Sequence, residues 1–362
     1  MSEAHPFSRK ELVSIKTAQR KRRRFLLTLL CDLLCTGTIL CVFALFHHVI
    51  PITVSKREAA QELSAVTPTP QPTPAPTATP EPEPEEEIVI ENKRQFPFEG
   101  VFSEALYTDE SSYRSPNLSL TITTHDENLG KGPVRWYVCD IYVADIRNLT
   151  TALAHGAYHY YDDEDILDMM ARENAVFAMS GDSCLRQYTT LAVRNGTVYA
   201  SEPTASEVCA LYRDGSMEIL HTEALDVEAL LARQGEEAVY QLWHFGPSLL
   251  DENGELRSSY NGNFDRYIFG GTLQPRTGIG YHEPGHYCFI VADGRGSSVG
   301  VTIEQFASLF VREGCALAYN LDGGRTSQIA FMGEKYNRQS NGNINPQNDI
   351  ICLVDFDARK EG

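Results

Sequence analysis

The stretch YCFIVADGRGSSVGVTIEQFASLFVREGCALAYNLDGGRTS, residues 287–327, contains the strongest fold signal in the chain. Its apolar runs and spacing predict a strand over 286–292, a helix over 302–312 and a strand over 315–321. The helix opens with a Thr302-x-x-Gln305 capping box and is closed by Gly314. We therefore expect a strand-helix-strand unit at this point of the fold.

Short strands and hairpin signals surround this unit. Alternation and β-branched or aromatic content predict strands over 118–124, 136–144 and 175–179, and apolar spacing near 3.6 predicts helices over 165–172 and 227–233. Asn195-Gly196 and Asp214-Gly215 are two-residue hairpin signals. The prediction is an α+β or mixed α/β fold, in which one domain over 96–362 holds a mixed, largely antiparallel sheet and few helices.

Charge is distributed unevenly along the 362 residues, whose formal net charge is −18. Residues 1–57 hold ten Lys and Arg against three Asp and Glu, whereas residues 96–362 hold 19 against 38. A body this acidic repels phosphate backbones, so we expect no nucleic-acid binding. A hydrophobic content of 42% is ordinary for a globular protein and excludes a disordered chain.

A basic N-terminus precedes a long apolar segment. Residues 1–24 end in the cluster Arg20 to Arg24, and residues 25–50 contain a single charged side chain, Asp32. A segment of this length crosses a hydrocarbon core of roughly 30 Å. Because positive charges precede it, we predict a transmembrane signal anchor with a cytoplasmic N-terminus and an extracellular C-terminal domain in the cell membrane. A cleaved signal peptide is the alternative, although no A-x-A site follows the apolar run.

The segment 51–95 is predicted to be an extracellular linker. Its central part, TPTPQPTPAPTATPEPEP at 67–84, has proline at eight of its 18 positions. Such a composition cannot bury a core and favours polyproline II, a semi-rigid spacer. The alternative, a ligand for SH3 or WW domains, requires a cytoplasmic location.

Cysteine and histidine spacing predicts neither a metal nor a cofactor. No C-x-x-C occurs, and the cysteines at 139, 288, 315 and 352 lie in apolar runs, where buried free thiols are expected. One or two disulfides among the exterior cysteines remain an alternative. The pairs His155 and His159, and His282 and His286, have metal-like spacing without an evident third ligand.

Two aspartates are expected at the carboxyl ends of buried strands, where ligands gather in open sheets. Asp293-Gly294-Arg295-Gly296 follows FIVA, and Asp322-Gly323-Gly324-Arg325 follows ALAYNL. The glycines let backbone approach a ligand, and the carboxylates suit acid or base chemistry. We expect these two motifs on adjacent strands of the strand-helix-strand unit, although a single Asp-Gly is usually only a turn.

Other clusters of the same kind occur along the chain. Ser180-Gly181-Asp182 and Phe245-Gly246-Pro247 each follow an apolar run, and Arg276 stands among small residues. An arginine there suits bidentate binding of a phosphate or carboxylate, with a surface ion pair as the alternative. The chain has no G-x-S-x-G, Walker A, H-E-x-x-H or G-x-G-x-x-G sequence, so those hydrolase, NTPase, protease and dinucleotide signatures are absent.

The order of these blocks resembles the phosphodiester glycosidase family. The successive blocks are NAVFAMSGDS, VRNGTVY, HFGPSLLDENGEL, PRTGIGY, the long stretch continued to residue 334, and NDIICLV. The resemblance covers about 136–356, and GVTIEQFA with NLDGGRTS is its most specific part. It implies a mixed α/β domain whose cleft binds a sugar-1-phosphodiester and hydrolyses the bond between the anomeric carbon and the phosphate oxygen.

The resemblance also implies which residues form the site. By motif, catalytic carboxylates are expected at Asp293, Asp322 and Asp182. The substrate-binding positions implied by the same motifs are Gly181, Gly246, Pro247, Arg276, Gly294, Arg295, Asn320, Gly323, Gly324, Arg325 and Ser327. An oxocarbenium-like transition state needs carboxylates near the anomeric centre, and the departing phosphodiester needs a cation such as Arg276 or Arg295.

Three positions depart from the family pattern. Ser180 stands where the family usually has Asn, Arg325 where it has Gly or Ser, and Asn345 where it commonly has Arg. These departures indicate a different substrate, a weakened activity, or an arginine relocated from 345 to 325.

Sequence therefore predicts a membrane-anchored hydrolase that acts on a glycosyl-phosphate bond in cell-envelope glycan or a related glycoconjugate. The alternative is a catalytically inactive envelope-glycan binding module with the same fold.

Overall fold

The structure is a computed structural model of the chain, and it describes residues 94–158, 162–182, 191–202, 207–260, 271–338 and 345–356. The chain divides into two compact units, Met1–Glu87 and Ile88–Gly362. The predicted anchor at 25–50 and all but the last two residues of the predicted linker at 51–95 lie outside the described residues. Among the residues that are described, no helix has the length and apolar character needed to span a bilayer.

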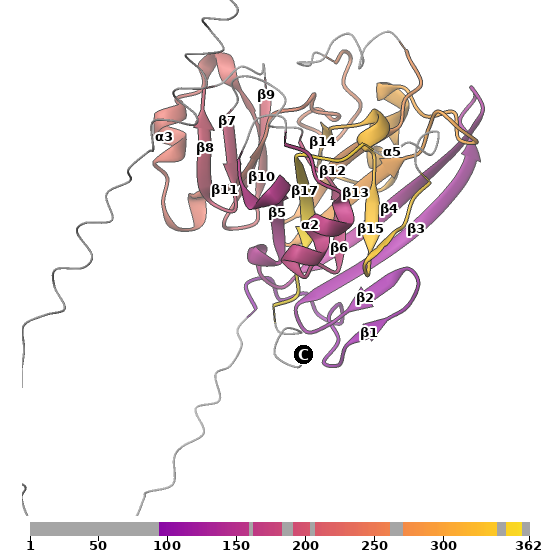
Figure 1. The fold of residues 1–362 in the computed structure, drawn as a ribbon. Helices are drawn as coiled ribbons and strands as arrows, with labels where there is room; N and C mark the ends of the chain where they lie inside the picture. Colours follow the sequence, from indigo (N-terminus) through magenta and orange to yellow (C-terminus); the bar gives the residue numbers. More distant parts are fainter. Residues whose placement is uncertain are drawn as a thin grey trace, which may run out of the picture. The chain divides into compact units, whose positions relative to one another are not determined.

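Within its described residues, the second unit contains three antiparallel sheets, three short α-helices and five 3-10 helices (Figure 1). Sheet 1 has the spatial order β1 (Tyr107–Thr108), β2 (Ser112–Arg114), β3 (Leu118–Asn128), β4 (Pro133–Val143), β13 (His286–Ala292), β12 (Arg276–Glu283), β14 (Leu317–Leu321). Sheet 2 has the order β16 (Glu334–Lys335), β15 (Ile329–Phe331), β6 (Phe177–Ser180), β17 (Asp349–Leu353), β5 (Leu149–Leu153). Sheet 3 has the order β10 (Met217–His221), β9 (Glu207–Tyr212), β11 (Val239–Trp243), β7 (Leu191–Arg194), β8 (Thr197–Ser201). The helices are α2 (Ile166–Glu173), α3 (Val227–Leu231) and α5 (Ile303–Arg312).

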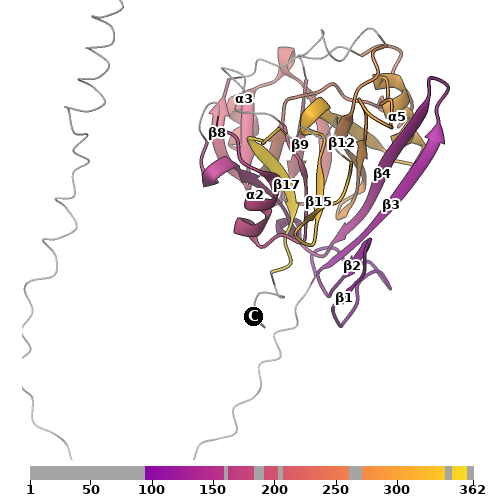
Figure 2. The same ribbon diagram turned by 45° about the vertical axis from the view of Figure 1, so that its right-hand side comes forward.

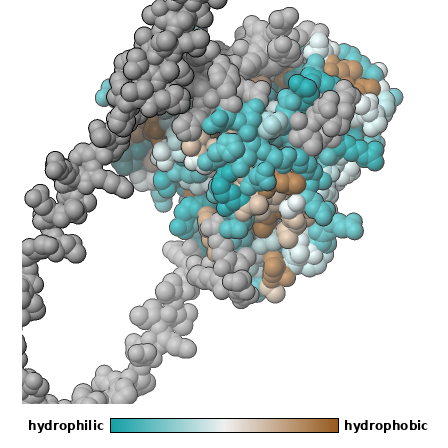
Figure 3. Space-filling model, in the orientation of Figure 1, coloured by the Kyte–Doolittle hydropathy of each residue, from teal (hydrophilic) through white to brown (hydrophobic). Residues whose placement is uncertain are grey.

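The apolar side chains form layers between these elements. The largest core joins one face of sheet 1 to sheets 2 and 3, and includes Tyr137, Phe289 and Tyr319 of sheet 1. On the other face of sheet 1, a second core packs against α5. Smaller cores lie between sheet 2 and α2, and between sheet 3 and α3. Because the apolar side chains pack in these cores, the coloured surface in Figure 3 is mostly hydrophilic, with small separate hydrophobic groups.

Local sequence signals explain several element boundaries. Thr302 and Gln305 form the predicted reciprocal capping box of α5, and Gly314 at φ +73° follows the helix. Asn195 and Gly196, both at positive φ, join β7 to β8 as the predicted two-residue hairpin. Asp214-Gly215 is different, because the register Met217↔Leu211 leaves a four-residue connection from 213 to 216 between β9 and β10.

Two predictions about the sheets are corrected by the pairing. The prediction of a largely antiparallel architecture with few helices is confirmed, since every strand pairing among the described residues is antiparallel, but these strands form three sheets where one was expected. The strands of the strand-helix-strand unit are not neighbours, because β12 pairs with both β13 and β14 and lies between them. The long β3–β4 hairpin continues sheet 1 from β13 outward (Figure 2). β13 and β14 therefore run parallel to each other on either side of β12, which comes earlier in the chain. No local sequence pattern reveals this order.

Candidate functional site

The polar motifs meet at one edge of sheet 1. Because β12 runs antiparallel to both neighbours, its first residue lies beside their last ones. Arg276 pairs with Ala292, immediately before Asp293, and Thr277 pairs with Leu321, immediately before Asp322. The structure thus brings the two predicted aspartates to the same sheet edge, with Arg276 between them.

Glycines make this edge compact. A Cβ on Gly294 would lie 2.7 Å from the backbone nitrogen of Pro275, and a Cβ on Gly323 would lie 3.0 Å from the Pro275 oxygen. Gly181 is equally confined, because its Cβ would lie 2.7 Å from the carboxyl group of Asp349. These glycines are therefore required for close approach of the strand ends to one another.

Asp293 is buried and hydrogen-bonded. Its Oδ2 accepts from the Tyr137 hydroxyl at 3.1 Å and its Oδ1 from Asn337 Nδ2 at 2.9 Å, on the face of sheet 1 that packs against sheets 2 and 3. Desolvation outweighs these bonds and raises the pKa of Asp293 from 3.8 to about 6. A carboxyl group with this pKa holds its proton closer to neutral pH than an exposed one, as an acid catalyst requires.

Asp293 should make the stability of the protein depend on pH. Because its pKa is raised in the folded state, its contribution is complete below pH 4 and is lost as pH rises through 6, by up to about 3 kcal/mol. Urea unfolding at several pH values measures this loss. The difference in free energy of unfolding between the wild-type protein and Asp293→Asn should fall between pH 4 and 7. An equal pH dependence of the two proteins would contradict the prediction.

Arg276 is also buried, with 4% exposure, so its alternative role as a surface ion pair is wrong. Its Nε donates to the carbonyl oxygen of Val301 at 3.1 Å, on the α5 side of sheet 1. Burial lowers its pKa to about 10, so the guanidinium stays charged at neutral pH. The backbone of Arg276 lies between those of Asp293 and Asp322, but its guanidinium lies on the opposite face of sheet 1 from the Asp293 carboxyl group. A buried cation at this edge suits the binding of an anionic group.

Arg276→Lys keeps the charge of this side chain and removes its planar fork. We expect kcat/KM to fall about 10- to 150-fold for an anionic diester, equivalent to about 1.5–3 kcal/mol of charge-assisted hydrogen bonding. Steady-state kinetics on the folded variant measure the change. Unchanged kinetics would remove Arg276 from the site.

Asn320 and Asp322 stand at the end of β14. Asn320 Nδ2 donates to the Gly246 carbonyl oxygen at 2.8 Å, and its backbone nitrogen donates to Pro247 at 3.0 Å. The Asp322 backbone nitrogen donates to the Gly181 carbonyl oxygen at 3.1 Å. The predicted motifs at 181, 246–247 and 320–324 are therefore joined directly to one another.

Two exposed arginines follow the two aspartates at this edge: Arg295 lies on the turn after Asp293, and Arg325 lies on the turn after Asp322. A Cβ on Gly324, which has φ +70°, would lie 3.2 Å from Nη2 of Arg295. Arg325 is exposed, and its carbonyl oxygen accepts from the backbone nitrogen of Asn345 at 3.5 Å. This contact places the backbone of residue 325 beside that of residue 345, the position where an arginine is common in the family, as the relocated-arginine hypothesis requires.

Arg325→Gly is therefore expected to weaken turnover of anionic diesters about 2- to 5-fold, the range for an exposed charge, while neutral sugars bind unchanged. Ligand affinity and kcat/KM on matched charged and neutral substrates measure the effect. A higher activity toward bulky diesters would show instead that Arg325 obstructs the site.

Buried polar atoms without a hydrogen-bond partner gather at this edge. Among the described residues they include Thr277 Oγ1, Asn320 Oδ1, Ser327 Oγ and Gln328 Oε1. Native proteins rarely leave such atoms unpaired, so water or a ligand is expected to bind them.

The Ser180 hydroxyl is hydrogen-bonded within the protein. Its Oγ donates to the Thr326 carbonyl oxygen and accepts from the Gln328 backbone nitrogen at 2.9 Å. These bonds connect the end of β6 to the segment 326–328.

Asp182 belongs to a fully buried network. Its carboxylate accepts from Arg194 Nη2 at 3.1 Å and from the backbone nitrogens of His244 and Phe245, and it lies 2.7 Å from His244 Nδ1. Arg194 Nη2 also donates to Asp349 Oδ2 at 3.0 Å. Desolvation alone would raise the pKa of Asp182, but His244 and Arg194 hold it below its ordinary value. With 0% exposure, Asp182 has the geometry of a positioning residue rather than of a group that touches substrate.

Sequence reasoning missed the partners of these carboxylates. Arg194, His244 and Asp349 all lie within the family blocks, but the sequence analysis assigns none of them to the site. The sequence contains one signal for Arg194, because this charged residue ends the apolar run LAVR at 191–194. Tyr137 and Asn337, which bind Asp293, stand alone in their segments and gave no signal.

Known proteins share parts of the sequence and the fold of this chain. A curated relative, the SPbeta prophage-derived uncharacterized protein YomE of Bacillus subtilis (strain 168), is 29% identical over 186 residues, which are 49% of this chain and only 28% of that protein. The catalytic domain of zebrafish N-acetylglucosamine-1-phosphodiester alpha-N-acetylglucosaminidase, auto-inhibited by its pro-peptide, superposes with a TM-score of 0.54 at 18% identity. That superposition covers 67% of this chain and 84% of the zebrafish one. The family model for phosphodiester glycosidases matches residues 171–354, half of the chain. The chain therefore belongs to the phosphodiester glycosidase family.

Proposed function

We propose that this protein hydrolyses the bond between the anomeric carbon of a sugar and the phosphate oxygen of a phosphodiester. The observation that carries the proposal is the register that sets buried Arg276 between Asp293 and Asp322 at one sheet edge. Membership of the family and the unpaired polar atoms of Asn320 and Ser327 support a polar ligand at the same place.

The residues suit distinct parts of this reaction. In the proposed step, the bond from the anomeric carbon to the phosphate oxygen breaks with its electron pair going to the oxygen, and water supplies the new bond to carbon. Asp322 acts as base or nucleophile at the anomeric carbon, and Asp293, with its pKa of about 6, donates a proton to the departing oxygen. Arg276 and Arg295 bind the departing phosphate monoester.

Release of a chromophore from a sugar-1-phosphate diester by the purified chain tests the proposal. The matched control is the same sugar and chromophore joined without phosphate, which the arginines should not recognise. Turnover of the diester alone supports the proposal. Saturable binding without turnover over a broad panel of diesters would favour the inactive envelope-glycan binding module.

We also propose that residues 25–50 anchor the protein in the cell membrane with the C-terminal unit outside, acting on envelope glycan. The basic cluster before this apolar segment supports that orientation. Protease added to intact cells should then cut within 51–95 and release a soluble C-terminal fragment. Protection of the fragment until the membrane is opened would show the opposite orientation.

A further inference from the structure

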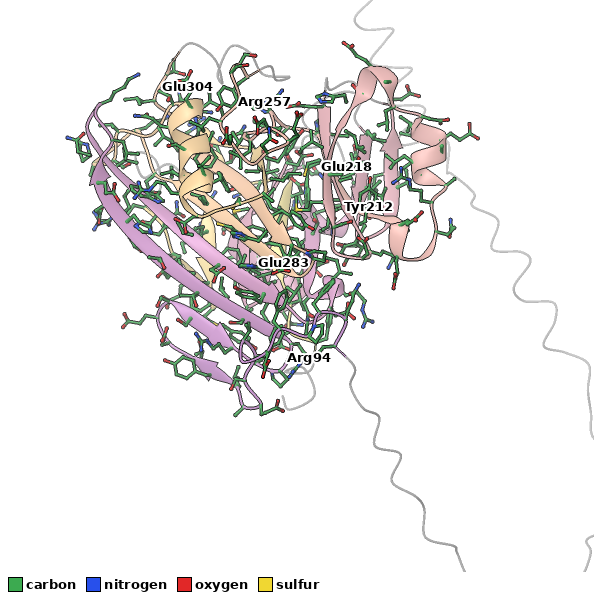
Figure 4. All side chains as sticks on the ribbon, turned by 180° about the vertical axis from the view of Figure 1, so that it is seen from behind. Arg94, Tyr212, Glu218, Arg257, Glu283 and Glu304 are labelled. Atoms are coloured by element: carbon green, nitrogen blue, oxygen red, sulfur yellow. The ribbon has the colours of Figure 1, made fainter. Side chains whose placement is uncertain are left out.

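A second polar cluster lies at the other end of β12. His282, Cys288 and Cys315 each offer one potential ligand atom, and all three atoms lie within 4.8 Å of one another. Glu283, labelled in Figure 4, follows His282 and marks this end of the strand. Glu304, also labelled, marks the first turn of α5, just after the Val301 that binds Arg276. The cluster is therefore separate from the candidate catalytic edge.

The fold creates the cluster by close packing around a glycine. Gly280 of β12 pairs with Cys288 of β13 on one side, and a Cβ on Gly280 would lie 2.7 Å from the Cys315 sulfur. Cys315 comes shortly after α5 and Gly314. Its thiol packs against Gly280, where the missing side chain leaves space for the sulfur. His282 lies two residues along the same strand, at a register shift between Tyr281 and Glu283, and its ring reaches the Cys315 sulfur.

We propose that His282, Cys288 and Cys315 bind a zinc-like divalent metal ion. The distance between Cys315 Sγ and His282 Nε2 is 3.8 Å. Ligands at typical zinc bond lengths and a tetrahedral angle lie about 3.6 Å apart for a nitrogen and a sulfur. Two thiolates and one neutral imidazole also balance the charge of the ion and provide the soft donors that zinc prefers.

The surroundings provide an outer shell and an entry path. The backbone of Gly314 forms a hydrogen bond with His282, and the His286 ring stacks on His282 with centroids 4.2 Å apart. Contacts of this kind fix the orientation of a ligating imidazole. His286 itself is occupied, because its Nε2 lies 2.7 Å from Asp140 Oδ1. A surface pocket lined by His282, Cys288 and Glu313 leads to the cluster and leaves room for a fourth ligand.

The proposed site differs from the spacing pattern of His282 and His286, because His286 Nε2 lies 2.7 Å from Asp140 Oδ1. The two further ligands of the proposed site come from β13, as Cys288, and from the residue after α5 and Gly314, as Cys315.

Cobalt titration of the purified, reduced and metal-free full chain tests the proposal. Cobalt should produce thiolate-to-metal charge-transfer absorption that saturates at a single ion per chain and is displaced by zinc. His282→Gln, a half-buried position that tolerates the change, and Cys315→Ala should each weaken the affinity more than about 100-fold, beyond the usual loss for an outer-shell residue. Cys352→Ala, which removes another buried thiol in sheet 2, is the matched control and should bind cobalt as the wild type does.

Zinc should also raise the Tm of the wild-type protein and not that of His282→Gln, a readout that does not depend on catalysis. Two results would overturn the proposal. One is a wild-type chain without charge-transfer absorption, and the other is absorption that persists unchanged in both variants. Recovery of a Cys288–Cys315 disulfide from a chain that binds no metal when reduced would assign the pair to redox chemistry instead.

Discussion

Asp322→Asn is expected to lower kcat about 10²- to 10⁴-fold while leaving substrate affinity nearly unchanged. Removing a catalytic base or nucleophile costs this much because the group acts only on the reacting bond. Asparagine has the same shape and retains a side-chain oxygen to accept from the Gly323 nitrogen, a bond of 2.8 Å in the wild type. Single-turnover and equilibrium-binding measurements on one diester separate the two effects.

The matched control is Asp251→Asn, which changes an exposed turn carboxylate that also accepts from nearby backbone nitrogens. It should leave kcat unchanged. A fully active Asp322→Asn protein would exclude Asp322 as base or nucleophile. A variant that loses binding together with turnover would place Asp322 in substrate recognition.

Arg194→Met is expected to destabilise the protein by about 3–5 kcal/mol. Arg194 is 1% exposed and neutralises Asp182 and Asp349, which are themselves 0% and 1% exposed. Removing one partner of a buried ion pair leaves uncompensated charge in the interior. Burial raises the pKa of Asp349 even with Arg194 present, so without the guanidinium both carboxyl groups should take up protons more readily. The loss in free energy of unfolding should therefore diminish as pH falls, measured by urea titration.

Arg147→Met is the matched control, since the Arg147–Asp145 pair is largely exposed on the arginine side and should contribute at most about 1 kcal/mol. Adding Asp349→Asn to Arg194→Met should restore part of the lost stability, because it removes one uncompensated charge. Equal losses for Arg194→Met and Arg147→Met would show that the buried network does not stabilise the fold.

Much of this architecture was predictable from local signals. The α5 boundaries follow from Thr302, Gln305 and Gly314, and the β7–β8 hairpin follows from Asn195-Gly196, because caps and tight turns are decided by a few neighbouring residues. The Asp-Gly motifs at 293 and 322 were predicted at strand ends for the same reason. An apolar run followed by Asp and Gly is a local sequence pattern, and recognising it requires no knowledge of distant contacts.

The family, the few helices and the strand-end positions of Asp293 and Asp322 follow from local patterns in the sequence. The placement of β12 between their strands, the burial of Arg276 and the buried network around Asp182 emerge only from the folded chain. The folded chain also brings Cys315 to His282 and Cys288 across Gly280. The difference lies in sequence separation, because caps, turns and hydrophobic periodicity depend on residues only a few positions apart. Strand order, desolvation and the pairing of buried charges depend on contacts between segments that the sequence separates by tens to more than a hundred residues.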